Sequence, residues 1–239
     1  MVQHKTIFDL GMNNGDDTAY YLHCGYKVIA IEANSELCKA ASIRFQHQIK
    51  NKQLKIINQA ISNEEKELTF YVNTQNSHWS SLDINWASRN DSQFVEFKTQ
   101  GITLSSLFEK FGCPYFMKVD IEGADLIAIQ QLIGQKSIPE FLSIEDCRYG
   151  FEYIDTLRKI GYKKFALSNQ ALVPQFPDVK RNYEFPAGAS GMFGEDLKSA
   201  WLEHDDFVEN YSTQVRNRTT LQKIADDPNS IWWDIHARV

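Results

Sequence analysis

Two glycines and two acids near the start of the chain have the spacing of a nucleotide-binding turn. The segment FDLGMNNGDD contains Gly11 and Gly15 in a G-x-x-x-G pattern after a strand-like run. Glycines at such a place allow a tight turn and a close approach of the backbone to a ligand. Asp9 lies just before the turn. Glu32 closes the next apolar run, where an acid can accept hydrogen bonds from both hydroxyls of a ribose.

The charge of the turn indicates which nucleotide it would bind. A pyrophosphate needs bare backbone amides, whereas this turn presents Asp16 and Asp17. Two carboxylates repel a phosphate but suit a cationic or zwitterionic ligand. S-Adenosylmethionine meets these requirements, because it is a nucleoside without phosphate that carries a sulfonium and an amino acid end. The alternative is a glycine turn of an ordinary α/β sheet, with Glu32 as a solvated strand end.

Strand-like and helix-like segments alternate around the turn. This alternation is typical of right-handed βαβ units that build a parallel sheet. Two strand-like segments, 67–72 and 94–99, interrupt it and predict an inserted hairpin or edge pair. The other predicted strands are 5–11, 26–32, 54–61, 114–120, 139–146 and 162–168. The predicted helices are 16–25, begun by Asp16 or Asp17, 34–51, begun by Asn34 or Ser35, 103–112, 124–134, 151–161 and a long stretch at about 195–225.

The C-terminal residues predict one more strand. From Ile231 to Val239, apolar and polar residues alternate with a period of two. We therefore expect a seven-stranded, mostly parallel sheet whose last strand is inserted antiparallel. No linker divides the chain, so we expect a single domain over 1–239, with an inserted segment at about 67–99 and a substrate-side region at about 169–200.

Composition narrows the classes of partner. The chain has 239 residues, 43% of them hydrophobic and 23% charged, as in globular proteins with a well-buried core. Its net charge of -6 argues against nucleic acid as a partner. No apolar run predicts a membrane span, and the N-terminus predicts no signal peptide. Four cysteines without C-x-x-C spacing suit a reducing cytoplasm, the location that we predict. The sequence predicts no oligomeric state.

Three motifs carry a resemblance to a known family. FDLGMNNGDDT resembles motif I of class I methyltransferases, with Asn13 in place of the middle glycine. KVDIEGAD, at 118–125, resembles a segment of the FkbM family, and NQAIS, at 58–62, matches where such enzymes place backbone against adenine. The resemblance covers about 6–146. It implies a Rossmann-like fold with strand order 3-2-1-4-5-7-6 and helices on both faces. It also implies S-adenosylmethionine as cofactor and methylation of a hydroxyl on a sugar, glycan or natural product.

The resemblance also implies which residues bind the cofactor. These residues share a position at or just after the ends of the first four strands. The predicted set is Asp9, Gly11, Asn13, Asn14, Gly15, Asp16, Thr18, Glu32, Ala33, Asn34, Ala60, Ile61 and Asp120.

Carboxylates at two strand ends are the candidate catalytic groups. Within the implied fold, Asp120 ends the fourth strand near the reacting methyl group, Glu122 follows it, and Glu145 ends the fifth strand. Methyl transfer to an alcohol is an in-line displacement in which positioning contributes much of the rate. The hydroxyl must also lose its proton, which a carboxylate within hydrogen-bond reach can accept. The alternatives are that Asp120 and Glu122 stabilise a helix N-terminus, or that Glu122 holds the loop by accepting backbone amides.

A metal and the acceptor contacts are weaker expectations. Asp120 with Glu145 or Asp146 offers oxygen ligands that suit magnesium or calcium, although we do not favour a metal. The aromatic insert and the region after Ser168 are expected to form the acceptor site for a small molecule or glycan. The predicted substrate residues are His78, Trp79, Ser81 and Asp146.

Other functions fit the sequence less well. A non-catalytic α/β module that kept only the nucleoside pocket is the main alternative to an oxygen methyltransferase. A NAD-dependent dehydrogenase is disfavoured by the missing third glycine and the acidic turn. A methyltransferase acting on the amino group of a base is disfavoured because neither N-P-P-[YF] nor D-P-P-Y follows the fourth strand.

Overall fold

The fold is described for residues 5–225 and 231–239 of a computed structural model, in two compact units that meet in the sequence between Ile138 and Pro139. The prediction of no signal peptide involves residues 1–4, which lie outside this description. No helix in the described ranges is long and apolar enough to cross a lipid bilayer. The prediction of a single domain stays a prediction, and each unit is considered by itself.

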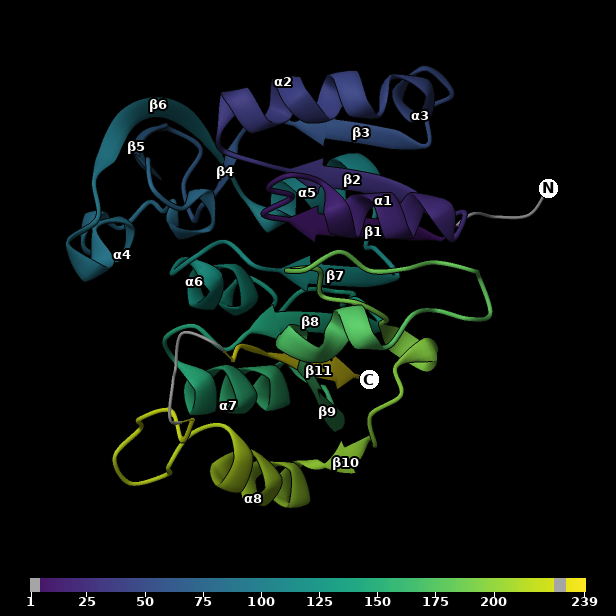
Figure 1. Cartoon of the computed structure of the whole chain (residues 1–239), viewed down its shortest axis with the longest axis vertical. Coiled ribbons are helices and arrows are strands. Elements are labelled where there is room, and N and C mark those ends of the chain that lie inside the picture. Colours follow the sequence, from purple (N-terminus) through teal and green to yellow (C-terminus); the bar gives the residue numbers. More distant parts are fainter. Residues whose placement is uncertain (1–4, 226–230) are drawn as a thin grey trace. The chain divides into compact units, whose positions relative to one another are not determined.

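The first unit contains four parallel strands (Figure 1). They are β1 (Thr6–Leu10), β2 (Lys27–Ile31), β3 (Leu54–Ile57) and β7 (Phe116–Val119), in the order β7-β1-β2-β3. Every residue of β7 and the last four of β1 and β2 are buried, as expected of apolar runs covered on both faces. The register pairs Asp9 of β1 with Lys118 of β7, so two charged side chains lie next to each other in the core.

Some helices of the first unit begin at a polar side chain that accepts from a free backbone amide. The Asn34 side chain accepts from the amide of Glu36, as predicted for one of the two candidate caps. Asp16 and Asp17 lie in the first turn of the first helix, next to the N-cap as predicted, and the N-cap itself is Gly15 in a left-handed conformation. The predicted helix 34–51 breaks at Phe45, whose backbone leaves the helical region. These helices are α1 (Asp16–His23), α2 (Ser35–Arg44), α3 (Gln46–Lys50), α5 (Leu104–Phe111) and α6 (Asp125–Gln130).

A second, three-stranded sheet forms the insert, and its order is β4-β6-β5. The strands β5 (Glu67–Asn73) and β6 (Phe94–Ile102) pair antiparallel, as predicted. Between them lie the short helices η1 (Ser77–Trp79), α4 (Ile84–Ala87) and η2 (Arg89–Asp91). The predicted strand 54–61 is divided, since β4 (Ala60–Ile61) leaves β3 and pairs with β6 instead.

The second unit also contains four strands, in the order β10-β9-β11-β8. The C-terminal strand β11 (Trp233–Arg238) pairs antiparallel with both β8 (Phe141–Glu145) and β9 (Lys164–Asn169), as the period of two predicted. The two-residue strand β10 (Leu202–Glu203) was not predicted; it adds an edge to β9.

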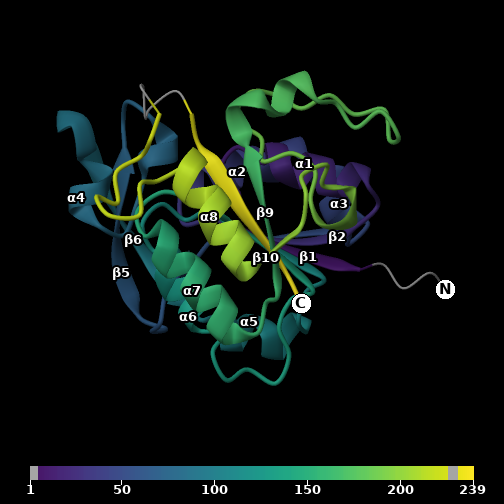
Figure 2. The same ribbon diagram turned by 90° about the horizontal axis from the view of Figure 1, so that it is seen from below.

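Helices α7 (Gly150–Ile160) and α8 (His204–Gln214) lie side by side in the second unit (Figures 1 and 2). The predicted long helix at 195–225 is therefore wrong over most of its length. It is replaced by the short helix η4 (Gly194–Asp196), β10, α8 and a turn closed by a bridge between Arg216 and Lys223. The region after β9 holds one further short helix, η3 (Gln170–Gln175).

The predicted fold class is confirmed, because the chain is α/β with mostly parallel strands. Within the first unit, β3, β2, β1 and β7 follow the 3-2-1-4 part of the predicted order. Within the second unit, β8, β11 and β9 follow the 5-7-6 part, and β10 is the additional strand.

A buried ion pair fixes the residues after β8 in the second unit. Asp146 is fully buried, and the Arg216 Nε lies 2.8 Å and 3.1 Å from its two carboxylate oxygens. The Tyr211 hydroxyl of α8 donates to the same carboxylate at 2.5 Å. A Cβ atom at Gly150 would lie 1.9 Å from that hydroxyl oxygen, so only glycine allows the tyrosine to approach. This cluster therefore joins α7, α8 and the end of β8.

Replacing Arg216 should destabilise the second unit strongly. Arg216→Ala leaves the Asp146 carboxylate buried without its cation, which costs about 3–5 kcal/mol of the free energy of unfolding. Urea denaturation measures the loss. Arg218→Ala is the matched control, because Arg218 is exposed, and its effect should stay within about 0.5 kcal/mol. Equal stability of the Arg216 variant and the wild type would contradict the structural role of the pair.

Candidate functional site

The glycine turn after β1 lies directly against the end of β7. Gly11 and Gly15 both have a φ of 84°, in the left-handed region. A Cβ atom at Gly11 would lie 1.8 Å from the carbonyl oxygen of Asp120, and one at Gly15 would lie 2.7 Å from the Phe45 ring. Both positions therefore require glycine, and the turn and the Asp120 segment form one site within the first unit.

The backbone amides of the turn already donate hydrogen bonds to acceptors within the chain. The amides of Gly11 and Met12 donate to the carbonyl oxygen of Ile31, and that of Gly15 donates to the carbonyl oxygen of Met12. The amides of Asn13 and Asp16 donate to the side chains of Glu32 and Asn14, respectively. The Asp16 carboxylate, which accepts from the Asn14 amide group, is paired with Arg44 at 2.8 Å. This turn has few free donors for a pyrophosphate, in agreement with a ligand that lacks phosphate.

Glu32, directly after β2, accepts hydrogen bonds from backbone amides of the turn and of its own loop. Its Oε2 accepts from the Asn13 amide at 2.9 Å, and its Oε1 accepts from the Asn34 amide at 2.7 Å. The carboxyl group is buried, and burial raises its pKa while the Asn34 and Asn13 amides oppose the rise. Each carboxylate oxygen can accept a further hydrogen bond, so Glu32 retains acceptor sites for hydroxyl groups.

The predicted adenine-side residues follow Glu32. Ala33 and Asn34 come directly after it, and the Asn58 side chain donates to the carbonyl oxygens of Glu32 and Ala33 at 2.9 Å and 3.0 Å. Ala60 and Ile61 are buried in β4, two residues beyond Asn58. Asn58 thus holds the start of NQAIS against the end of β2.

A buried cluster of charges lies beneath the turn. The Lys118 Nζ is 2.9 Å from Asp120 Oδ2 and 3.3 Å from Asp17 Oδ2. Burial works to lower the pKa of Lys118, but Asp120, Asp17 and Asp9 together raise it well above its usual value. The ammonium group is therefore charged, and it links β7 to the first turn of α1.

Asp9 contributes an unsatisfied acceptor to the cluster. Its Oδ2 accepts from the Thr18 hydroxyl at 2.5 Å, while its buried Oδ1 has no hydrogen-bond partner among the described residues. Burial raises the pKa of Asp9 to about 6, against the lowering effect of Lys118. An orphaned carboxylate oxygen at a glycine turn, with Glu32 at the next strand, fits S-adenosylmethionine, whose hydrogen-bond donors include an ammonium group and ribose hydroxyls.

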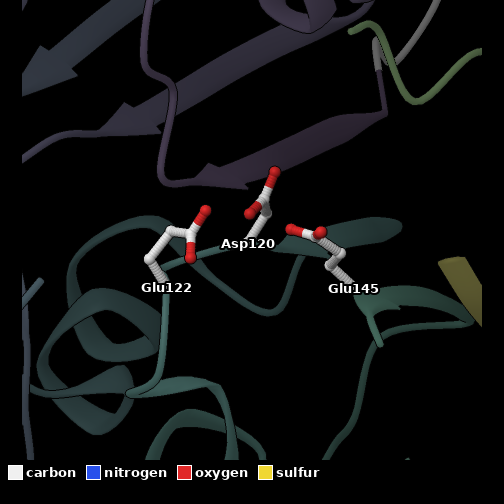
Figure 3. A group of neighbouring side chains, drawn as sticks. All are labelled: Asp120, Glu122 and Glu145. Carbon is white, nitrogen blue, oxygen red and sulfur yellow. The ribbon is translucent and has the colours of Figure 1, made fainter. Parts of the chain in front are cut away.

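Glu122 follows β7 with its carboxyl group held by the insert. Its Oε2 accepts from Trp86 Nε1 at 2.7 Å and from Arg89 Nη2 at 2.9 Å. Burial raises the pKa of Glu122 to about 8, although the Arg89 guanidinium lowers it. Asp120 and Glu122 each place a carboxylate oxygen within 4.8 Å of the other (Figure 3).

Three of the predicted substrate residues lie in the insert, on the same unit as these carboxylates. The exposed His78 places its Nδ1 3.1 Å from Asn13 Nδ2 in the glycine turn. The ring of Trp79 lies under the Arg89 guanidinium, 4.8 Å from ring centroid to Cζ. Ser81 is buried and donates to the carbonyl oxygen of Glu122 at 2.5 Å. The insert therefore reaches both the turn and the Glu122 loop.

The remaining predicted residues belong to the second unit. Glu145 is the last residue of β8 (Figure 3). Asp146 has both carboxylate oxygens engaged by Arg216, so a role in substrate binding would require this pair to open. Their predicted roles stay predictions. A metal remains the reading that we do not favour, because the Lys118 ammonium already lies against Asp120.

Arg89 and Arg216 were not among the site residues predicted from the sequence. Arg89 lies 33 residues before its partner Glu122, and Arg216 lies 70 residues after Asp146. No periodicity connects residues that are so far apart in the chain. The sequence feature that could have indicated Arg89 is the aromatic insert, where the arginine follows a tryptophan in the segment W-A-S-R.

Comparison with solved structures gives likenesses with TM-scores below 0.5. Against an FkbM methyltransferase from Methylobacillus flagellatus KT the score is 0.43 at 14% identity, over 66% of this chain and 36% of that protein. Against precorrin-6y C5,15-methyltransferase from Geobacter metallireducens GS-15 it is 0.42 at 11% identity, over 98% and 78%. Against a Burkholderia thailandensis 1,6-didemethyltoxoflavin-N1-methyltransferase, solved with S-adenosylhomocysteine, it is 0.40 at 9% identity, over 99% and 71%.

The chain thus covers about a third of the Methylobacillus protein's length. The comparison with curated proteins found no match.

A family model gives the decisive match. The model of the methyltransferase FkbM domain matches residues 9–164, which include the glycine turn, Glu32 and the KVDIEGAD segment. The resemblance seen in the sequence is therefore confirmed, because the matched model is that of a methyltransferase domain. The chain belongs to the FkbM methyltransferase domain family.

Proposed function

We propose that this chain is an S-adenosylmethionine-dependent methyltransferase that acts on a hydroxyl group of a sugar, glycan or other small natural product. The observation that carries the proposal is the contact between the glycine turn and the end of β7. Because a Cβ atom at Gly11 would lie 1.8 Å from the Asp120 carbonyl oxygen, the cofactor turn and the Asp120–Glu122 carboxylates belong to one site. A module that only bound a nucleoside would not need carboxylates beside its turn.

The turn supports a cofactor with a nucleoside and a cationic end. Glu32 would bind the ribose hydroxyls, and Asp9, with its unpartnered oxygen, would bind the amino group. Asn13, Asn14, Asp16 and Thr18 are the proposed contacts of the turn and α1. Ala33, Asn34, Ala60 and Ile61 would border the adenine. When bound, S-adenosylmethionine supplies an electrophilic methyl group on a sulfonium.

Glu122 is the carboxylate best placed to accept the proton of the acceptor hydroxyl. Its Oε2 receives two hydrogen bonds, and no described residue donates to its Oε1. A carboxyl group whose pKa lies at about 8 exchanges a proton near neutral pH, as a general base requires. Asp120 is already paired with Lys118, so it would orient the acceptor hydroxyl rather than take its proton. The acceptor oxygen would form the new bond to the methyl carbon as the bond from that carbon to the sulfonium sulfur breaks, with S-adenosylhomocysteine as the leaving group and the proton passing to Glu122.

The acceptor class follows from the polar and aromatic character of the insert. His78, Trp79 and Ser81 lie on the segment that contacts both the turn and the Glu122 loop. Aromatic faces and hydroxyl-binding side chains suit a ring with several hydroxyl groups. The acidic net charge of -6 supports a small-molecule acceptor over nucleic acid.

Loss of Glu32 should weaken cofactor binding. A hydrogen bond to a charged group contributes about 1.5–3 kcal/mol, so Glu32→Ala should raise the Kd for S-adenosylmethionine by roughly one to three orders of magnitude. Isothermal titration calorimetry measures this change, with NAD as a ligand that the wild type should ignore. Glu36→Ala is the matched control, because Glu36 is exposed in the same strand-to-helix region and, among the described residues, forms an ion pair only with Lys39. Tighter binding of NAD than of S-adenosylmethionine would end the proposal.

Substitution of the carboxylates should separate binding from chemistry. Glu122→Gln keeps the shape but removes the proton acceptor, so the turnover number should fall by about 10²–10⁴. The Kd for S-adenosylmethionine should stay within a few-fold of the wild type. Asp120→Asn should cost less turnover, because it removes an orienting group. Transfer of a labelled methyl group to a panel of glycosides and polyhydroxylated natural products measures both effects.

The same experiment can contradict the assignment. Near-normal turnover of Glu122→Gln on an identified acceptor would exclude Glu122 as the base and leave Asp120 or Glu145. Tight cofactor binding without transfer to any acceptor would favour the non-catalytic module.

A further inference from the structure

Arg89 makes contacts with both terminal nitrogens and with the face of its guanidinium group. Its Nη2 donates to Glu122 Oε2 at 2.9 Å, and its Nη1 donates to the carbonyl oxygen of Trp86 at 2.8 Å. The guanidinium lies over two indole rings, 4.3 Å from the centroid of Trp86 and 4.8 Å from that of Trp79. An isolated surface ion pair contributes little and is easily rearranged. A guanidinium that contacts two aromatic rings and also makes two hydrogen bonds is held in one orientation.

The backbone conformation of the Glu122 loop allows the close contact with Trp86 and Arg89. Glu122 has a φ of 51°, which is unusual for a residue with a side chain. Gly123, at a φ of 94°, would place a Cβ atom 3.2 Å from the Trp86 ring. The Ser81 hydroxyl holds the carbonyl oxygen of Glu122 at 2.5 Å. A costly backbone conformation persists where surrounding contacts fix it, and such positions concentrate at functional sites.

The charges around Glu122 make Arg89 its counter-ion. Asp120 and Asp125 are the other acids that act on Glu122 from the same unit. Asp120 faces Lys118, and Asp125 accepts from the amides of Ile121 and Gly123. Among the described residues, Arg89 is the cation in contact with Glu122. The insert therefore supplies both the charge and the geometry of this carboxyl group.

We propose that Arg89 is a positioning residue that, together with Trp86, fixes Glu122 Oε2 so that Oε1 is presented for proton transfer from the acceptor. The insert at 67–99 is then part of the catalytic machinery and not only a wall of the acceptor site. This inference rests on the proposed function for the role of Oε1, whereas the hold of Arg89 on Glu122 can be tested without any acceptor.

The first test follows the Trp86 indole N–H signal by NMR in the ligand-free protein. The chain has five tryptophans, and Trp86→Phe identifies the signal by its loss. Because this N–H donates to Glu122, its chemical shift should change with pH and reach its midpoint near 8. Arg89→Met removes the cation that favours the charged form, so the midpoint should rise by about one pH unit or more. Glu122→Gln should abolish the titration.

Two further variants serve as controls for the effect of Arg89→Met on the Glu122 titration. Arg89→Lys keeps the charge but loses the planar stack, so its midpoint should lie between those of the wild type and Arg89→Met. Lys98→Met changes an exposed cation on β6 of the same insert and should leave the midpoint unchanged. A Trp86 signal that does not titrate in the wild type, or an Arg89→Met midpoint equal to the wild-type one, would overturn the proposal.

Catalysis provides the second readout. Because a base must be ionised to act, turnover should increase with pH through the Glu122 midpoint. Arg89→Met should shift this increase to higher pH and lower the turnover number at pH 7.5 at least tenfold, with the Kd for S-adenosylmethionine within a few-fold of the wild type. A loss of cofactor affinity without a shift of the pH profile would overturn the positioning role. A protein that binds no S-adenosylmethionine but shows the NMR shift would refute the proposed function alone.

Discussion

The buried ammonium group of Lys118 is the contact on which the site of the first unit depends. It lies in β7 opposite Asp9 of β1 and pairs with Asp17 and Asp120. Three carboxyl groups that repel one another can approach because one cation lies among them. Removing a cation from such a place leaves uncompensated buried charge. The acids of the glycine turn and the end of β7 are therefore held by a single side chain, and their positions are determined together.

The insert adds the side chains that this cluster lacks. Strands β5 and β6 bring Trp86 and Arg89 to Glu122, Ser81 to the backbone of the same loop, and His78 to Asn13. These contacts come from segments separated by more than 30 residues from their partners. The Rossmann-like strands thus provide the glycine turn and the carboxylates, while the insert holds the Glu122 carboxyl group and opposes the rise in its pKa that burial causes.

The sequence predicted what depends on local pattern. Buried strands such as β1, β2 and β7 are short apolar runs, and the period of two at 231–239 predicted β11. The family motifs placed the turn and Asp120 at strand ends. Other features depend on tertiary contacts that leave no periodicity. The stretch 195–225 has helical composition, yet most of it forms η4, β10 and a turn beside α8. The ion pairs Arg89–Glu122 and Arg216–Asp146 form between residues far apart in the chain, so no helical or strand periodicity could predict them.

The contact between Gly11 and the Asp120 carbonyl oxygen has a thermodynamic consequence. With no room for a methyl group between them, neither segment can move toward the other without displacing it. A ligand that shifts one segment therefore changes the affinity of the other segment for its own ligand. Because such coupling is reciprocal, a cofactor and an acceptor that bind as proposed on these two segments would alter each other's dissociation constants by the same factor. Demethylation of the cofactor during turnover would then change the affinity for the methylated product, which links release of the two products through a single glycine.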